Sequence, residues 1–154
     1  MLKRTACLLV MLALVAPAAR AESVRVVNVI DEATVRVFVD GATRELRLIG
    51  LAPSGRGSAY ARRAKEKLEE LVLRREVRLK YDRVRRSTDG KLLGYVYVRW
   101  GRNDIFVNAH MLELGHARLG DFDGNAIHKK EFEALNRNAR KAGRGRFGPS
   151  APRR

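Results

Sequence analysis

Positive charge is the property of this sequence with the most direct chemical meaning. The chain has 32 lysine and arginine residues against 17 aspartate and glutamate residues, a formal net charge of +15. Basic side chains are dense at residues 62–67 and 83–86. Because guanidinium and ammonium groups bind phosphate oxygens, the excess predicts a polyanionic partner, either nucleic acid or an anionic envelope surface. A basic protein without such a partner is the alternative.

Thiol and histidine chemistry have no support in the residue pattern. The single cysteine, Cys7, lies in an N-terminal segment that is predicted below to be removed, which excludes disulfides and cysteine-type zinc sites from the remaining chain. His110, His116 and His128 have neither a metal-ligand spacing nor a nucleophile partner. We therefore expect all three histidines at surface or helix-end positions.

Aromatic side chains give a second, weaker indication of nucleic-acid binding. Phe122, Tyr95, Tyr97 and Trp100 carry rings that could stack on bases. Tyr95 and Tyr97 are two residues apart and so share one face of a predicted strand. For these two tyrosines, packing in the core is the favoured role.

The first 21 residues predict an export signal. Two cations precede an apolar run at residues 6–15, and Ala19 and Ala21 supply the small side chains of a cleavage site. The run is about half the roughly 20 residues that a membrane-spanning helix needs, and no later segment is apolar enough to span. We expect residues 1–21 to be a signal peptide, the mature chain to begin at Glu22, and the protein to be periplasmic or secreted.

Period-two alternation of apolar residues predicts a β-rich first half. Three strands fall between residues 23 and 50, and two more at residues 76–81 and 92–100. Asp40-Gly41 stands between the second and third strands, and Asp-Gly favours a tight antiparallel hairpin because both positions tolerate a positive φ.

Helical spacing predicts about three helices around these strands. Apolar residues recur at intervals of three and four in residues 61–72, 107–114 and 128–142, and Gly115 follows the second of these segments as a helix stop. The element order predicts an α+β domain over residues 22–148, a five-stranded β-barrel of the oligonucleotide-binding (OB) type with about three helices. Residues 149–154 form a basic tail.

The order of motifs resembles the staphylococcal nuclease (thermonuclease) family over nearly the whole mature chain. Six matching segments occur in the right order, at residues 29–35, 47–53, 64–82, 89–96, 107–117 and 143–148. The resemblance implies the OB-type barrel and hydrolysis of DNA and RNA phosphodiesters with a calcium ion. In that family aspartates hold the ion, a glutamate helps to activate the attacking water, and two arginines grip the phosphate.

The sequence departs from the family at the catalytic carboxylates. The first motif, Asp-Gly-Asp-Thr in the family, reads Asp31-Glu32-Ala33-Thr34, so Ala33 stands where a metal ligand belongs. In the second motif Leu51 is followed directly by Ala52, and the second metal-binding aspartate is missing near that point. Ser54 stands where the catalytic glutamate belongs, and a hydroxyl cannot replace a carboxylate base at neutral pH.

The phosphate-binding charge is retained. Arg47 keeps the place of one family arginine, and Lys91 replaces the other, which preserves the charge without the two-pronged grip of a guanidinium. The resemblance thus implies nucleic-acid contacts at Arg47 and Lys91. The basic loop adds three further candidate contacts, Arg83, Arg85 and Arg86.

Two pairs of acids remain as sources of a rebuilt metal site. Asp31 and Glu32 flank the vacancy at Ala33, but neighbours on a regular strand point to opposite faces, so we expect at most Asp31 to contribute. Asp121 and Asp123 lie where family members often place aromatic residues that contact the nucleotide. We expect no bound metal, and calcium only if the protein is active.

The leading hypothesis is an exported, monomeric nucleic-acid-binding domain with little or no calcium-dependent phosphodiesterase activity. The first alternative is an active nuclease with a rearranged metal site. The second is a domain that uses its charge on another protein or on envelope anions.

Overall fold

The structure is a computed structural model that describes residues 21–55 and 57–148. The predicted signal peptide, apart from Ala21, and the predicted basic tail at residues 149–154 lie outside the described residues. In the described part of the chain, no helix is long and apolar enough to cross a membrane.

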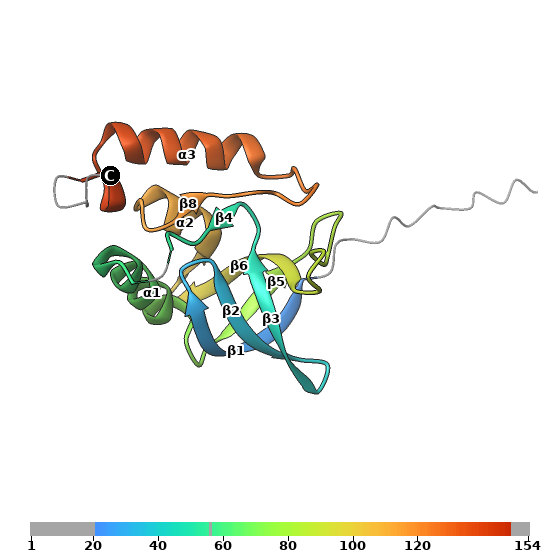
Figure 1. Ribbon diagram of the computed structural model, residues 1–154. Coiled ribbons are helices and arrows are strands. Elements are labelled where there is room, and N and C mark those ends of the chain that lie inside the picture. The colour runs from blue at the N-terminus through green and yellow to red at the C-terminus, as the bar shows by residue number, and fades with distance from the viewer. Residues whose placement is uncertain (1–20, 56, 149–154) are drawn as a thin grey trace, which may run out of the picture.

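Five strands close into a barrel (Figure 1). They are β1 (Glu22–Asp31), β2 (Thr34–Val39), β3 (Ala42–Leu48), β5 (Glu76–Lys80) and β6 (Leu92–Trp100). Neighbours pair in the order β3-β2-β1-β5-β6, and β6 pairs with β3 to complete the ring. Inward-facing valines at alternate positions, such as Val24 and Val26, are at most 3% exposed and fill the interior. The predicted α+β class and five-stranded OB-type barrel are confirmed.

The strand pair that closes the barrel is parallel and joins distant parts of the chain. Arg47 pairs with Leu93, and Leu48 pairs with Gly94. Glycine is required at position 94 because a Cβ atom there would clash with the Leu79 side chain. Arg47 therefore lies in the β3–β6 pair that closes the barrel, which we call the seam, next to the start of β6.

The predicted hairpin between β2 and β3 is confirmed. The strands pair antiparallel from Thr34 opposite Arg47 to Val39 opposite Ala42. Asp40 and Gly41 make the turn with φ values of 50° and 73°. Both angles are in the left-handed region that a two-residue hairpin turn of this hand needs.

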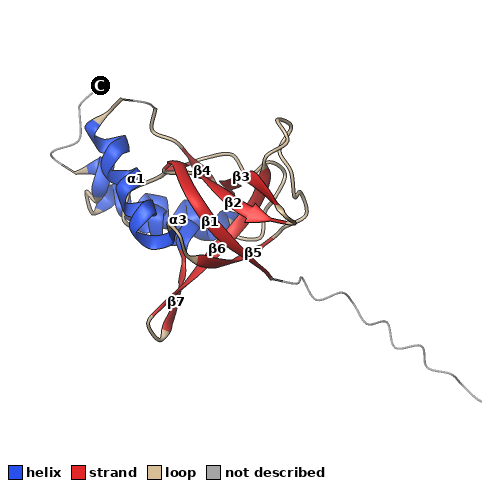
Figure 2. Ribbon diagram, turned by 90° about the horizontal axis from the view of Figure 1, so that it is seen from below, coloured by secondary structure: helices blue, strands red, loops and turns tan. Residues whose placement is uncertain are grey.

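Three helices cover one side of the barrel, with α3 lying along the outside of α2 (Figures 1 and 2). They are α1 (Ala59–Val72), α2 (Val107–Glu113) and α3 (Lys129–Lys141). The Ser58 hydroxyl caps α1 by accepting a hydrogen bond from Ala61 N at 2.9 Å. Phe132 is the fully buried anchor of α3. Each of the three predicted helices is present, with ends within two residues of the prediction.

The short elements of the fold were not predicted from the sequence. β7 (Asn103–Phe106) forms a hairpin with β6 and projects from the barrel (Figure 2). The two-residue strands β4 (Leu51–Ala52) and β8 (Arg118–Leu119) pair antiparallel beside α3, and a 3-10 helix spans Gly145–Phe147. Elements this short contain too few residues for a period to be recognised.

A fully buried asparagine ties α2 to the barrel. Asn108 Oδ1 accepts a hydrogen bond from Val96 N at 2.9 Å. Its Nδ2 donates to Ile49 O at 3.0 Å and to Gly94 O at 3.2 Å. Three hydrogen bonds thus join the start of α2, the middle of β6 and the chain that follows β3.

Two histidines near the contact between α1 and α2 predict acid sensitivity. Burial and the nearby Lys67 ammonium lower the pKa of both His110 and His116. Glu113 and Glu70 oppose the shift at His110 but do not cancel it. The ring of His116 stacks on Tyr60, with centroids 6.3 Å apart. In the folded state these two imidazoles therefore stay neutral at pH values where the histidines of the unfolded chain, with a pKa of about 6.5, take up protons. Stability should fall as the pH drops below about 6.5.

The test is the pH dependence of urea unfolding. The loss should stay well below the limit of about 1.4 kcal/mol per pH unit for each histidine, because both rings are partly solvated. His116→Phe keeps a ring against Tyr60 and should flatten the dependence between pH 7 and pH 5. An unchanged slope in this variant would mean that His116 binds protons equally in the folded and unfolded protein.

Candidate nucleic-acid interface

Arg47 is held by an acidic residue from a distant loop. Its Nη2 atom lies 2.7 Å from both carboxylate oxygens of Asp123, and the two side chains are 30% and 22% exposed. Asp123 lies between β8 and α3. The guanidinium therefore lies at the barrel seam, and its charge is balanced within the chain.

Lys91 is also paired within the chain. Its ammonium contacts the Asp89 carboxylate and lies 3.9 Å from Glu45 Oε2. Hydrogen bonds from Lys91 and then from the Ser87 hydroxyl lower the pKa of Asp89 to about 2, and Asp89 in turn raises the pKa of Lys91. Both groups stay charged at neutral pH.

Pairing of β3 with β6 brings the two cations to one face. Lys91 lies two residues before Leu93, the partner of Arg47, and contacts Glu45 on the outward side of β3. A shallow pocket of about 440 Å³ opens beside Lys91, and its charged lining residues are Arg44, Arg86, Lys91, Glu45 and Asp89.

The three loop arginines predicted to bind nucleic acid are exposed, and Arg86 lines this pocket. Arg85 stacks its guanidinium over Tyr81 at 5.0 Å, and Arg86 Nη1 donates to Gly90 O at 3.2 Å. The backbone of Arg86 forms an antiparallel β-bridge with Leu92, and Arg85 O accepts from Leu93 N at 2.9 Å. Four of the five predicted cationic residues therefore lie on or next to the seam, and Arg83 lies further along the loop.

Neither Ala33 nor Ser54 brings a carboxylate to the site. Ala33 is fully buried in the turn between β1 and β2, where its carbonyl accepts from Leu48 N at 2.8 Å. Ser54 N donates to the Glu32 carboxylate, and Ser54 Oγ accepts from Arg146 Nη1 at 2.9 Å. A serine thus sits in a polar cluster built by residues from three parts of the chain.

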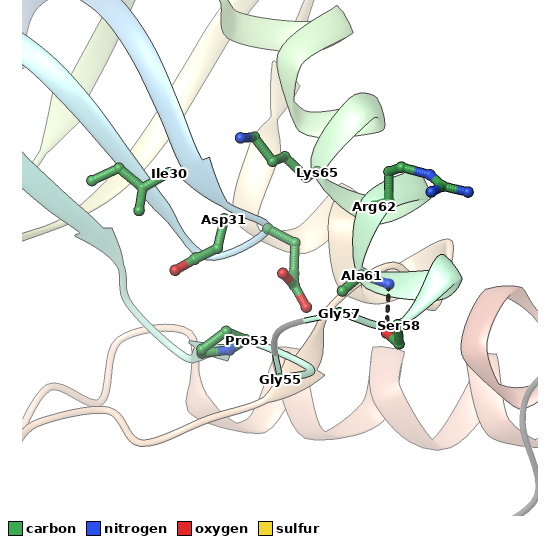
Figure 3. Close-up of a pocket in the computed structure, with 10 residues that line it drawn as sticks. Ile30, Asp31, Pro53, Gly55, Gly57, Ser58, Ala61, Arg62 and Lys65 are labelled. Carbon is green, nitrogen blue, oxygen red and sulfur yellow. Dashed lines mark hydrogen bonds between the residues drawn. The ribbon is translucent and has the colours of Figure 1, made fainter.

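The expectation that Asp31 and Glu32 face opposite sides was wrong. Residues 32–33 form a turn instead of continuing the strand, and both acids line one pocket of about 690 Å³. In Figure 3 Asp31 stands on one wall of this pocket, and Arg62 and Lys65 on α1 form another. The contribution of Glu32, which is only 2% exposed, was missed. A glutamate in place of the family's motif glycine was the available signal.

The acids around Ala33 do not fit a calcium ion. Asp31 Oδ1 accepts from Ala33 N at 2.9 Å, and the Glu32 carboxylate is bound by Ser54 N. Within residues 21–55 and 57–148, no three histidine, cysteine, aspartate or glutamate side chains gather closely enough to hold a metal ion. Calcium prefers six to eight oxygen ligands, several of them carboxylates.

Of the candidate stacking rings, only Trp100 is well exposed. Tyr95 is 2% exposed, which confirms its place in the core, and Tyr97 is half-buried. Phe122 was a wrong candidate because it is 8% exposed and packs against Phe132, with ring centroids 6.0 Å apart. Trp100 is 38% exposed and carries Arg75 over its ring at 4.2 Å.

The histidine expectation is confirmed in part. His128 is the N-cap residue of α3 and packs on Phe106 and Phe132, with ring centroids 4.7 and 5.7 Å away. His110 lies in the last turn of α2. His116, in contrast, has a buried Nδ1 without a hydrogen-bond partner among the described residues, so it is not a simple surface residue.

Comparison with known proteins agrees with the barrel and the motif order. The sequence model of the family described as "Staphylococcal nuclease homologue" matches residues 39–146. The thermonuclease of Staphylococcus hyicus is 27% identical over 129 residues, which cover 80% of this chain and 74% of that protein. The thermonuclease of Staphylococcus intermedius is 28% identical over 128 residues, covering 79% and 74%. Since the family model spans most of a chain that also folds into the expected barrel, this chain belongs to the staphylococcal nuclease homologue family.

Proposed function

We propose that this chain is an exported, monomeric nucleic-acid-binding domain with little or no calcium-dependent phosphodiesterase activity. One observation carries the binding proposal: the parallel pairing of β3 and β6 gathers Arg47, Lys91 and the basic loop at one seam. Cations spaced along such a face follow a phosphate backbone without reading bases.

The family chemistry supports a binder over a hydrolase. Hydrolysis in this family needs a metal site and a base, and Ala33 and Ser54 supply neither. The cationic positions of the same motifs are kept. Binding needs only this retained part, so the proposal uses what the site contains.

An active nuclease with a rearranged site is the second candidate, and Glu32 is the observation that favours it. Its carboxylate meets the backbone of Ser54, the residue that stands in the place of the catalytic glutamate. A carboxylate from the neighbouring turn therefore lies close to where the family base is attached. Cleavage that Glu32→Gln abolishes would support this candidate.

The binding proposal is tested with single-stranded and double-stranded oligonucleotides over a range of salt. Affinity should fall at least about tenfold between roughly 50 and 200 mM salt, because each bound phosphate releases counterions. Arg47→Ala/Lys91→Ala should weaken binding about tenfold further at fixed salt, as expected for two lost phosphate contacts.

Arg137→Ala/Lys130→Ala is the matched control. Arg137 and Lys130 are both exposed on α3, and their loss lowers the net charge by the same two units. Circular dichroism should show both variants folded. Equal affinities for the two double variants would place the binding surface elsewhere, with residues 62–67 on α1 as the next region to test.

A further inference from the structure

The loop that supplies Asp123 is fixed against the barrel. Gly120 N donates to Gly50 O at 2.9 Å, and Gly50 N donates to Asp121 O at 3.3 Å. Phe122 inserts into the core, and Asp123 N donates to Asp121 Oδ1 at 3.0 Å. These contacts hold the backbone that leads to Asp123, so its carboxylate is positioned before any ligand arrives.

The same loop is tied to the basic loop. Asn125 is 3% exposed, and its Oδ1 accepts from Val84 N at 2.8 Å while its Nδ2 donates to Val84 O at 3.1 Å. Val84 lies between Arg83 and Arg85. The loop that carries Asp123 is therefore hydrogen-bonded to the basic loop at residues 83–86.

The carboxylate of Asp123 occupies one donor nitrogen of Arg47 that an anionic ligand could use. Both oxygens lie 2.7 Å from Nη2, which is the distance of a charge-assisted hydrogen bond. Phosphate oxygens also bind guanidinium groups through charge-assisted hydrogen bonds. A phosphate that binds at Nη2 must therefore replace this carboxylate.

We infer that Asp123 is a specificity-determining residue that competes with phosphate for Arg47, so that the seam selects polyanions over isolated phosphates. A ligand with one or two phosphates must displace Asp123 through a single contact. A nucleic-acid strand places several phosphates on neighbouring cations. Once these are bound, the next phosphate of the strand meets Arg47 at a high effective concentration and can displace Asp123. The inference rests on the proposed function, because it refines which phosphate ligands the same seam accepts.

The chain contains its own matched control for a test of Asp123. Asp40-Gly41 and Asp123-Gly124 are both Asp-Gly turns, with φ of 50° at each aspartate and of 73° and 81° at the glycines. Asparagine tolerates this left-handed conformation well. Asp40 lies at the opposite end of the β2–β3 hairpin from Arg47. Asp123→Asn and Asp40→Asn therefore remove the same charge from the same local backbone.

The first experiment uses inorganic pyrophosphate and needs no nucleic acid. Stabilisation by a ligand grows with its occupancy of the folded state, so the rise in Tm with pyrophosphate reports binding. Asp123→Asn should bind pyrophosphate about tenfold more tightly than the unmodified protein or Asp40→Asn, and adding Arg47→Ala to Asp123→Asn should remove the gain. Equal Tm shifts in all four proteins would overturn the inference.

The second experiment measures affinity for a single-stranded DNA oligonucleotide against salt. Because a strand already displaces Asp123 in the unmodified protein, Asp123→Asn and Asp40→Asn should have the same salt dependence, with slopes that differ by less than about 0.7, the slope of one phosphate contact on single strands. Pyrophosphate should gain more from Asp123→Asn than the oligonucleotide does. A larger gain for the oligonucleotide would contradict selection of polyanions by Asp123.

The two experiments separate the inference from the proposed function. If the unmodified protein fails to bind any oligonucleotide, the proposed function is wrong, while the pyrophosphate comparison still decides whether Asp123 shields Arg47. If oligonucleotides bind but Asp123→Asn matches Asp40→Asn in both assays, the function stands and Asp123 is only a structural partner of Arg47.

Discussion

Calcium is expected to leave phosphodiester cleavage by the unmodified protein at background. Loss of a general base alone typically costs about 10²–10⁴ in rate. Loss of the metal removes several kcal/mol more of charge stabilisation in the transition state. The prediction rests on the proposed correspondence of motifs, in which the fully buried methyl group of Ala33 replaces a ligand oxygen and the Ser54 hydroxyl replaces the base.

A gain-of-function variant gives this prediction its sharpest form. Ala33→Asp, Ala52→Asp, Ser54→Glu and Lys91→Arg together should create calcium binding and measurable cleavage. Substitution at Ala52 is preferable to an inserted aspartate because Ala52 pairs with Arg118, and an insertion would shift this strand pair. Single changes should do little, since metal, base and phosphate grip act as a unit.

Two readouts separate metal binding from cleavage in that variant. Calcium should raise its Tm, because an ion that binds only the folded state stabilises it, and the unmodified protein should show no such shift. Arg47→Ala serves as the control for a contaminating nuclease. Calcium-dependent hydrolysis by the unmodified protein that disappears in Arg47→Ala would show that other acids, Asp31 and Glu32 first, hold the ion.

The largest expected loss of stability follows from Asn108→Leu. Leucine has a similar size but leaves Val96 N and Ile49 O buried without the partners that Asn108 provides. Each orphaned group costs about 1–3 kcal/mol, so the free energy of unfolding should fall by about 2–6 kcal/mol. Urea denaturation followed by circular dichroism measures this loss.

The matched control for this core prediction is Asn138→Leu on the exposed side of α3. Surface substitutions of this kind typically change stability by less than about 0.5 kcal/mol. A loss at Asn108 no greater than that at Asn138 would mean that water enters and satisfies the two backbone groups.

Long periodic segments carried the prediction of the fold. Alternating valines predicted β1 and β2, and Asp40-Gly41 predicted their hairpin partner β3, because a two-residue turn restricts the following strand to antiparallel pairing. Helix α1 followed from its apolar stripe. The pair β4–β8 joins distant segments that no local period encodes, and β7 is a four-residue hairpin strand, too short for its period to be recognised.

The sequence nominated residues for the site but not their pairings. The motif order assigned Arg47 and Lys91 to phosphate binding and Ala33 and Ser54 to degenerate catalytic positions, and these assignments stay predictions. The ion pair of Arg47 with Asp123 joins segments far apart in the sequence, so only the fold reveals it. Regular strand geometry predicted the wrong side for Glu32, because the chain enters a turn at that residue.

The parallel pairing of β3 with β6 also affects the order of events during folding. Arg47 and Lys91 come together only when strands separated by α1 and β5 meet, and pairings between distant segments form slowly because loop closure precedes them. A partly folded chain with an open barrel therefore has the full positive charge but no assembled seam. During refolding, salt-sensitive attraction to polyanions should precede the contacts of Arg47 and Lys91, whose appearance would then report the moment of barrel closure.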